Sequence, residues 1–297
     1  MIGVTGANGY VGGRILAHLR AAGIDAVAMV RRPGPADAKA RPYALDTPLE
    51  ASLLEDIELV VHAAYDVSPR GSRLREVNVS GTLPLLEGLA ARGARMVLVS
   101  SLSAFAGTRS QYGRSKLELE REVLERGGVA LRPGLIFGAG ARGSQGGLFG
   151  AMVAAVSRRS LVPLIGGGRQ RMFVTHDRRL CELIAAIAGG RVSSEGPLFA
   201  AHEVPTSVRA IAAQIAQAHG RRLRAMPVPG SLAELGLRCG ELAHLGLPFR
   251  SDSVRSLMNP IPLDEVAVLA RSGVAFPALT PELWAEPQVD PEAQLDR

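Results

Sequence analysis

Short apolar runs rich in β-branched residues alternate with mixed stretches of Ala, Leu, Arg and Glu along the first half of the chain. Each run has the length of a strand, and its near-continuous apolar character predicts burial on both faces of a parallel sheet. The mixed stretches are amphipathic, as surface helices are. Strands are predicted at residues 2–5, 26–30, 59–63, 95–100, 129–132 and 198–201, and helices at residues 10–22, 77–92, 110–126 and 177–188.

This alternation predicts an α/β fold: a Rossmann-type doubly wound parallel sheet with a smaller, mainly helical C-terminal substrate lobe. The alternation breaks at two glycine-rich passages, residues 138–150 and 166–168, which are typical of a flexible region that faces substrate. Beyond them, proline-punctuated connections separate helices predicted at 207–219 and 231–245.

The same pattern predicts two domains. We expect a dinucleotide-binding domain over residues 1–160, joined by a returning segment at about 172–203. The remainder of residues 161–297 is expected to form mainly the substrate-binding lobe, ending in a polar tail at 287–297.

Composition narrows the class of protein. The 297 residues, 47% of them hydrophobic, suffice for one large α/β unit. Cys181 and Cys239 lie far apart with no second Cys or His at metal-ligand spacing, so neither a metal site nor a disulfide framework is predicted. The N-terminus opens directly into a strand, and no apolar stretch approaches the roughly 20 residues of a membrane span. We expect a cytoplasmic protein with no membrane partner.

The charge of the chain limits the kinds of molecule that it is expected to bind. The net charge of +6 comes from scattered arginines, which suit small phosphate-bearing molecules but also occur on any solvated basic surface. Only 4% of the residues are aromatic, so the chain has few side chains on which nucleic-acid bases could stack. A small-molecule substrate is expected, and nucleic-acid binding is not.

A glycine pattern supplies the first functional signal. Gly6, Gly9 and Gly12 follow the first predicted strand and open the first predicted helix, with Asn8, Tyr10 and Val11 between them. The glycines allow a tight turn, close approach of the backbone to a diphosphate, and close packing of helix on sheet, while free N–H groups at the helix start face the phosphate charge. In this strand-to-helix context, the pattern predicts a dinucleotide cofactor.

The second predicted strand ends at Val30, where NAD-binding proteins place a carboxylate for the ribose hydroxyls. Here Arg31 and Arg32 follow, and guanidinium groups at that position would pair with the 2′-phosphate of NADP. NADP is therefore the preferred cofactor and NAD the alternative. Asp46 falls where an acidic side chain could meet the adenine amino group, although it could equally be an ordinary loop residue.

Five further segments give the chain a family resemblance. They are His62–Tyr65, Val77–Thr82, Val99–Ser103, Tyr112–Lys116 and Arg171–Asp177. With these segments the chain resembles, over nearly its whole length, the extended short-chain dehydrogenases/reductases, which include the NAD-dependent epimerases and dehydratases of nucleotide sugars and NADP-dependent carbonyl reductases.

The resemblance implies roles for several residues. Ala63, Ala64 and Tyr65 would lie against the cofactor, and Pro133 and Gly134 would line the nicotinamide pocket. Further cofactor-site positions are Asn78, on a helix whose asparagine is structural in this family, and Ser100. Arg171 corresponds to an arginine that contacts a substrate diphosphate, and the family often forms homodimers through the helix that carries Tyr112.

Tyr112 and Lys116 are the candidate catalytic pair. Four residues apart on a predicted helix, they share one face. A nearby ammonium and the cationic nicotinamide favour the phenolate and lower the tyrosine pKa from about 10 toward working pH. Tyr112 can then exchange a proton with a substrate hydroxyl or carbonyl. The resemblance adds a substrate-polarising hydroxyl, for which Ser101 is preferred and Ser103 is the competitor.

Three functions remain open. An oxidoreductase that transfers hydride at a carbonyl or hydroxyl carbon is favoured by Arg31 and Arg32. A nucleotide-sugar epimerase that retains NAD is favoured by Arg171 and the glycine-rich passages; a dehydratase ranks lower because residues 101–106 contain no acidic side chain. The third is a cofactor-sensing protein without turnover, against which the intact Tyr112 and Lys116 pair argues.

Overall fold

The structure is a computed structural model of the whole chain. It describes residues 1–35, 37–139, 147–159, 161–242 and 250–285. Eight strands form one sheet in the order β14-β11-β6-β5-β4-β1-β2-β3, and every neighbouring pair is parallel. The strands are β1 (Ile2–Thr5), β2 (Ala26–Val30), β3 (Arg41–Pro42), β4 (Leu59–His62), β5 (Arg95–Val99), β6 (Val129–Pro133), β11 (Leu198–Ala200) and β14 (Ala270–Arg271).

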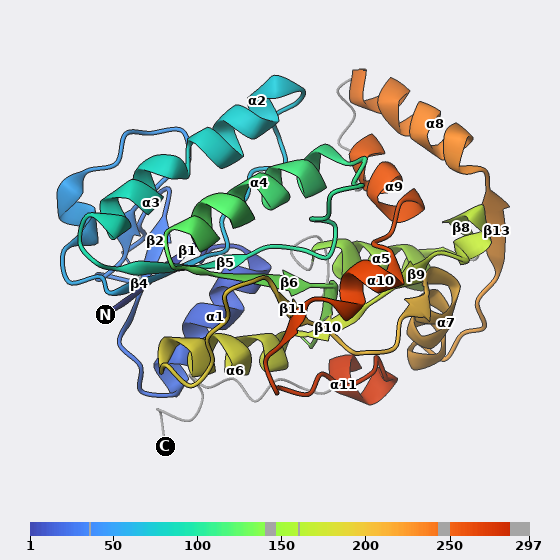
Figure 1. Ribbon diagram of the computed structural model, residues 1–297. Helices are drawn as coiled ribbons and strands as arrows, with labels where there is room; N and C mark the ends of the chain where they lie inside the picture. The colour runs from blue at the N-terminus through green and yellow to red at the C-terminus, as the bar shows by residue number, and fades with distance from the viewer. Residues whose placement is uncertain (36, 140–146, 160, 243–249, 286–297) are drawn as a thin grey trace.

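Helices cover both faces of this sheet (Figure 1). On one face lie α1 (Tyr10–Ala21) and α6 (Asp177–Ala188), and on the other lie α2 (Ser72–Arg75), α3 (Leu83–Ala90) and α4 (Gln111–Glu125). The predicted α/β class, Rossmann-type and doubly wound, is confirmed. Because the strand order reverses direction between β1 and β4, the crevice for a ligand is expected at the carboxyl ends of these two strands.

Period-two alternation along the strands divides the core into two layers. Val4 and Val61 point to the α1 and α6 side, while Met29, Val60 and Leu98 point to the α3 and α4 side. All five side chains are fully buried. Burial on both faces explains why these strands are nearly continuous apolar runs in the sequence.

The prediction of one unbroken helix over residues 77–92 was wrong. The stretch predicted at 77–92 consists of a π-helical turn, Glu76–Ser80, followed by α3. Pro84 stands in the first turn of α3, where its missing N–H costs nothing. Gly81 lies between the two pieces, and a Cβ atom there would overlap the carbonyl oxygens of Leu45 and Val77. The close approach of the neighbouring loop therefore accompanies the break.

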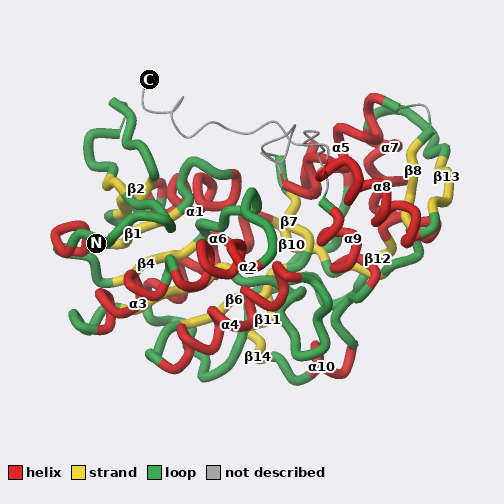
Figure 2. Tube along the Cα trace, turned by 90° about the horizontal axis from the view of Figure 1, so that it is seen from above, coloured by secondary structure: helices red, strands yellow, loops and turns green. Residues whose placement is uncertain are grey.

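A second lobe lies beside the carboxyl ends of the strands (Figures 1 and 2). Its helices are α5 (Gly147–Arg158), α7 (Val208–Ala218), α8 (Gly230–Leu242), α9 (Ser251–Met258), α10 (Leu263–Ala267) and α11 (Pro281–Ala285). Three short strand pairs accompany them, none of which the sequence pattern predicted: β8 (Val162–Ile165) with β13 (Ala225–Val228), β9 (Arg171–Met172) with β12 (Thr206–Ser207), and β7 (Leu135–Phe137) with β10 (Val174–His176).

The chain crosses between the lobe and the sheet more often than the sequence indicated. The predicted returning segment contains α6 and β11, and β14 returns a second time to the edge of the sheet. The division into two domains stays a prediction. Residues 140–146 of the first glycine-rich passage, residues 243–245 at the end of a predicted helix, and the tail lie outside the described residues.

A buried ion pair joins α4 to the central strands. Glu120 accepts hydrogen bonds from Nε and Nη2 of Arg132 on β6, at 3.0 and 2.6 Å, and from the hydroxyl of Ser100. Glu120 is 1% exposed and Arg132 6%. Burial raises the pKa of the Glu120 carboxyl, and the bonds from Arg132 and Ser100 oppose that shift.

This pair predicts a specific pattern of stability. Arg132→Met leaves the Glu120 carboxylate buried without its cation and should lower the free energy of unfolding by about 3–5 kcal/mol. The double variant Glu120→Gln/Arg132→Met removes both charges and should recover most of that loss. Denaturant unfolding of both variants checks this, and a cost below about 1 kcal/mol for Arg132→Met would contradict a tightly coupled pair.

Candidate active site

The glycine loop between β1 and α1 packs directly on the end of β4. Gly6 has a positive φ of 67°, and a Cβ atom there would lie 2.8 Å from the backbone N of Ala64. A Cβ atom at Gly12 would overlap the carbonyl oxygen of Gly6. Gly9 donates to Gly6 at 2.9 Å and closes the turn. Larger residues would therefore push the helix away from the sheet.

The start of α1 offers backbone donors to an anion. The N–H groups of Tyr10, Val11 and Gly12 occupy the first turn, where no helical carbonyl is available to them. Gly9 at the N-cap supplies no side-chain acceptor, and the first turn contains no acidic residue. Asn8 is exposed at the tip of the loop. Free donors at a positive helix end, on a loop of small residues, fit a cofactor diphosphate.

Tyr10 contributes to the loop in a way the sequence did not indicate. Its hydroxyl donates to Asp177 Oδ2 at 2.9 Å, and Arg14 Nε reaches the same oxygen at 3.0 Å. Burial, followed by the charge of Asp177, raises the pKa of the Tyr10 phenol. The helix that begins at the glycine loop is thereby anchored to α6, which begins at Asp177.

The end of β4 is held by a buried polar network. Thr5 Oγ1 accepts a hydrogen bond from Ala64 N at 3.2 Å and lies 3.0 Å from Nδ1 of His62. His62 is fully buried, and burial lowers the pKa of its imidazole to about 3, so the ring is neutral. His62 therefore supports the strand end, and Ala63 and Ala64 lie half-buried beside the glycine loop.

Asn78 holds the segment that follows β4. Its amide donates to the carbonyls of Asp66 and Leu74 at 2.8 and 2.9 Å, and its Oδ1 accepts from Asp66 N at 2.7 Å. The side chain is 1% exposed. Its amide is thus directed at the backbone, and it fixes the conformation of the segment that follows β4.

The predicted ribose-recognition residues lie on the surface at the next strand end. Arg31 and Arg32 follow β2 directly, and both are exposed. Among the described residues neither forms an ion pair. Asp46 is in the loop after β3, with its side chain exposed. Both arginines therefore remain accessible to a phosphate at the carboxyl end of β2.

Tyr112 and Lys116 lie together on α4, as their spacing predicts. Lys116 Nζ is 6.0 Å from the centre of the Tyr112 ring and 5.0 Å from that of Tyr65. The Tyr65 and Tyr112 rings meet edge to face with centroids 4.9 Å apart, and the Tyr65 hydroxyl lies 2.8 Å from Ser115 Oγ. Lys116 thus lies against two aromatic rings and donates to the Val99 carbonyl at 2.8 Å.

Burial shifts both ionisable groups of this pair. It raises the pKa of Tyr112 to about 12, an effect opposed by the Ser101 hydroxyl and strengthened by Glu120. It lowers the pKa of Lys116 to about 8, and the charge of Glu120 opposes that shift. A cation placed in the crevice would lower the Tyr112 pKa, since it stabilises the phenolate.

The candidate hydroxyls differ in their surroundings. Ser101, just after β5, accepts a hydrogen bond from Ser103 N at 3.1 Å. Its hydroxyl also bonds the Tyr112 phenol and opposes the rise in the pKa of that phenol. Ser103 Oγ instead lies 2.9 Å from Ser256 Oγ of α9. Ser100 is buried, and its hydroxyl is directed at Glu120. This geometry favours Ser101 as the hydroxyl that faces a substrate at Tyr112.

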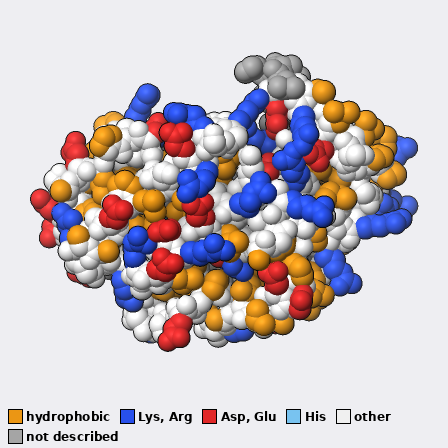
Figure 3. Space-filling model, turned by 45° about the horizontal axis from the view of Figure 1, so that its top comes forward, with side chains coloured by type: hydrophobic (Ala, Val, Ile, Leu, Met, Phe, Trp, Pro, Cys, Tyr) orange, Lys and Arg blue, Asp and Glu red, His pale blue; other side chains and the backbone are white. Residues whose placement is uncertain are grey.

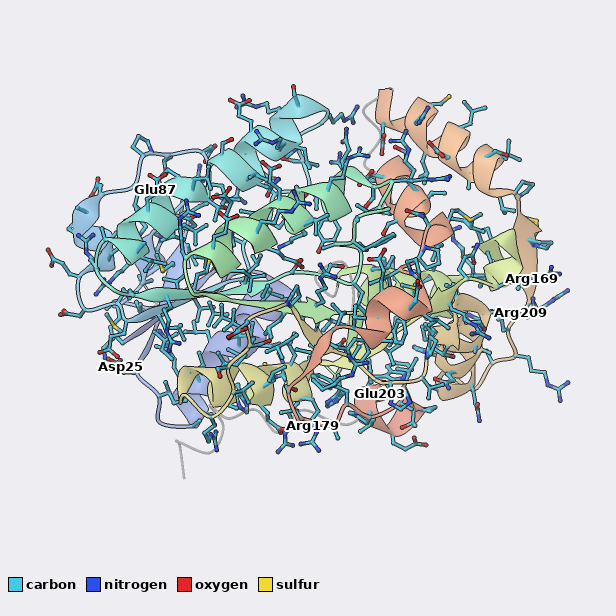
Figure 4. The ribbon with its side chains drawn as sticks, viewed as in Figure 1. Asp25, Glu87, Arg169, Arg179, Glu203 and Arg209 are labelled. Carbon is cyan, nitrogen blue, oxygen red and sulfur yellow. The ribbon has the colours of Figure 1, made fainter. Side chains whose placement is uncertain are left out.

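The remaining predicted site residues lie at the end of β6 and on β9 of the second lobe. Pro133 ends β6, and Gly134 N donates to Thr175 Oγ1 at 2.9 Å. A Cβ atom at Gly134 would overlap the Phe173 carbonyl, so this turn needs glycine. Arg171 is exposed on β9 of the second lobe, at whose outer edge Arg169 and Arg209 also lie (Figure 4). Arg171 thus lies on the lobe expected to bind substrate, on a strand pair formed by β9 and β12.

Three important residues escaped the sequence analysis. Glu120 lies one helical turn after Lys116, and Arg132 is a charge within an apolar strand; both facts were visible as signals of a buried pair. Asp252 accepts hydrogen bonds from Gln111 N and Tyr112 N at 2.8 and 3.0 Å. No local pattern marks Asp252, because its partners are about 140 positions away.

Other kinds of site find no support in the described part of the chain. No group of three or more His, Cys, Asp and Glu side chains there could hold a metal ion. None of the helices described is long and apolar enough to span a membrane. On the face shown in Figure 3, basic side chains are interspersed with acidic ones, as the scattered arginines in the sequence indicated.

Comparison with known proteins agrees with this arrangement. The model of the NAD dependent epimerase/dehydratase family matches residues 2–193. No curated protein matches the chain. Solved structures resemble its fold at low sequence identity.

MoeE5 in complex with UDP-glucose and NAD has a TM-score of 0.70 at 21% identity, covering 100% of this chain and 99% of that chain. The UDP-glucose 4-epimerase of Thermus thermophilus in complex with NAD has a TM-score of 0.61 at 21% identity, over 86% and 97% of the two chains. The dTDP-glucose 4,6-dehydratase of Bacillus anthracis str. Ames in complex with NAD has a TM-score of 0.64 at 16% identity, over 77% and 84%.

The buried Lys116 predicts a pH dependence of stability. Its pKa is lowered from 10.5 to about 8 in the folded protein, so between these values the unfolded chain binds a proton that the folded chain lacks. The free energy of unfolding should therefore rise with pH across this window, by about 3 kcal/mol from this group. Lys116→Met should remove that rise, as denaturant titrations from pH 7 to 10.5 would show. Parallel curves for the two proteins would contradict the assigned burial cost.

Proposed function

This chain belongs to the NAD dependent epimerase/dehydratase family, and from that premise we propose that Tyr112 is the acid/base of a hydride transfer at a carbonyl or hydroxyl carbon. One observation carries the proposal. Tyr112, Lys116 and Ser101 converge after β5, two strands from the glycine loop at the end of β1. A reacting carbon between them would meet a proton donor and a hydride carrier together.

The chain's own residues fit a nicotinamide dinucleotide, which supplies the hydride acceptor and donor when bound. The glycine loop and the N–H groups of Tyr10, Val11 and Gly12 would hold the diphosphate. Ala63, Ala64 and Tyr65 would border the cofactor, with Pro133 and Gly134 at the nicotinamide end. Lys116 would hold the ribose and favour the Tyr112 phenolate.

The proton moves between Tyr112 Oη and the substrate oxygen. For oxidation, the phenolate takes the hydroxyl proton; for reduction, the phenol returns it to the carbonyl oxygen. Ser101 Oγ would donate to the same substrate oxygen and fix its orientation. For oxidation the phenol must first lose its proton: burial raises its pKa to about 12, and the cationic ring of the oxidised nicotinamide would lower that pKa. For reduction the neutral phenol is already the reactive acid.

Two substrate classes remain in the proposal. A carbonyl compound reduced by NADPH is favoured by Arg31 and Arg32, which are exposed where a 2′-phosphate would lie. A nucleotide sugar epimerised with retained NAD is favoured by Arg171 and by the whole-chain likeness to MoeE5, whose structures contain NAD with UDP-glucose or UDP-glucuronic acid. Dehydration ranks below epimerisation because residues 101–106 offer no carboxylate.

Two further expectations belong to this proposal. A reducing, cytoplasmic setting is supported by Cys181 and Cys239, both free thiols, of which Cys239 is exposed. Pairing of two copies through α4 is implied by the family resemblance.

Tyr112→Phe tests the acid/base assignment. The variant should lose about 10²- to 10⁴-fold in kcat, because general acid–base catalysis contributes on that order. Cofactor affinity should stay unchanged, since the lost hydroxyl is directed at the substrate oxygen. Turnover would be screened with UDP-glucose, UDP-glucuronic acid and a panel of carbonyl compounds.

The matched control for this test is Tyr43→Phe, which removes a phenol hydroxyl from the core near α3. It should retain wild-type turnover. Full activity in Tyr112→Phe would sink the assignment, and tight cofactor binding without turnover in the wild type would support the sensing protein instead.

Calorimetric titration with NADPH, NADH and their oxidised forms tests the cofactor preference, after a check for cofactor that copurifies. Arg31→Ala/Arg32→Ala should weaken NADPH binding about 10- to 100-fold, the worth of one or two charge-assisted hydrogen bonds, and leave NADH binding unchanged. NAD retained through purification without any 2′-phosphate preference would overturn the NADP assignment and favour the epimerase.

A further inference from the structure

Helix α9 of the second lobe contacts the segment that connects Ser101 to Tyr112. Its Ser256 hydroxyl lies 2.9 Å from Ser103 Oγ, and Asn259, at its C-terminal end, accepts from Arg109 N at 2.9 Å. Near its N-terminal end, Asp252 accepts from the backbone of α4. Figure 1 shows α9 between α8 and the N-terminal end of α4.

The contact through Asp252 completes the first turn of α4. In any α-helix the first N–H groups lack partners within the helix. Here Ser110 accepts from Gly113 N at 2.9 Å, while Asp252 accepts from Gln111 N at 2.8 Å and Tyr112 N at 3.0 Å. The carboxylate is also favoured by the positive end of the helix dipole. Part of this cap therefore comes from the other lobe.

The helix that carries Asp252 is fixed to α8 by the residues on either side of Asp252. The neighbouring Ser251 donates to Glu241 through both its N–H and its hydroxyl, at 2.8 and 2.9 Å. Arg255 Nε donates to Glu234 Oε1 at 2.9 Å. The carboxylates of Glu241 and Glu234 thereby join α8 and α9 into one unit, the α8–α9 unit. Because Asp252 is part of α9, a displacement of α8 would also move Asp252.

We infer that Asp252 is a positioning residue for Tyr112: by binding the backbone of Gln111 and Tyr112, it makes the orientation of the Tyr112 phenol depend on the docking of the α8–α9 unit. Asp252 touches no reacting atom and acts through the first turn of α4. Ser256 and Asn259 hold the connecting segment from the same helix. This inference rests on the proposed acid/base role of Tyr112.

The test compares Asp252→Ala and Asp252→Asn with the wild-type full chain. Asp252→Ala should lower kcat about 10- to 100-fold, because a misplacement of about 1 Å can cost 10²-fold in rate. The dissociation constant of the cofactor should change less than about 2-fold, since the glycine loop is untouched. Asp252→Asn keeps one acceptor oxygen but no charge, and its loss should be intermediate.

Hydrogen exchange of residues 103–116 provides a readout without substrate. Amides of Gln111 and Tyr112 should exchange faster in Asp252→Ala, while those of β1 and β4 stay as protected as in the wild type. Glu182→Ala is the matched control: it removes a carboxylate that accepts from Arg179 at 2.6 Å on the surface of α6. It should change neither kcat nor exchange in 103–116.

The outcomes separate the positioning role of Asp252 from the proposed acid/base role of Tyr112. If Asp252→Ala shows wild-type kcat, or wild-type exchange in 103–116, the positioning role is overturned. Equal losses of kcat in Asp252→Ala and Glu182→Ala would also overturn it, since they indicate general destabilisation. If the wild type or Tyr112→Phe contradicts the proposed function, exchange still decides whether Asp252 fixes the turn. If Asp252→Ala fails to fold, Asp252→Asn carries both measurements.

Discussion

The buried pair of Glu120 and Arg132 is the interaction on which the arrangement of the candidate site depends. It joins α4 to β6, and through Ser100 it also reaches the end of β5. A charge at this depth is tolerated only because Arg132 and Ser100 satisfy the carboxylate oxygens. The same carboxylate opposes the lowering of the Lys116 pKa and strengthens the raising of the Tyr112 pKa. One ion pair thus fixes the helix, and its carboxylate modifies the pKa shifts that burial causes in the two groups.

The surrounding polar residues act mainly on backbone rather than on ligand. Thr5 holds Ala64, Asn78 holds Asp66, and Thr175 holds Gly134, each by a hydrogen bond to a segment that follows a strand. Strand ends in a parallel sheet carry free backbone groups, and the loops that leave them need such partners to keep one conformation. The ends of β1 and β4 thus bring together small residues, Gly6 and Gly9 with Ala63 and Ala64, and exposed backbone of this kind suits a phosphate-bearing cofactor.

The second lobe contacts the candidate site directly. Its α8–α9 unit contacts the residues between Ser101 and Tyr112, and its exposed Arg171 stands on a separate strand pair. Family membership and similar folds at 16–21% identity establish the architecture but do not identify the substrate. If this lobe binds the substrate, as we propose, then substrate binding and the alignment of the proposed acid/base depend on the same part of the chain.

The sequence by itself determined six of the eight strands of the sheet, the glycine loop and the placing of Tyr112 beside Lys116, because each depends on local periodicity or on spacing within one element. The two-residue edge strands β3 and β14 are too short to leave such a pattern. The sequence also indicated α1 and α6 nearly to the residue. The tertiary structure alone decided the break at Gly81, the carboxylate of Asp252 at the start of α4, and the attachment of Tyr10 to Asp177. These contacts join residues far apart in the chain, and a side chain's partner across such a distance is set by packing, which leaves no periodic trace in the sequence.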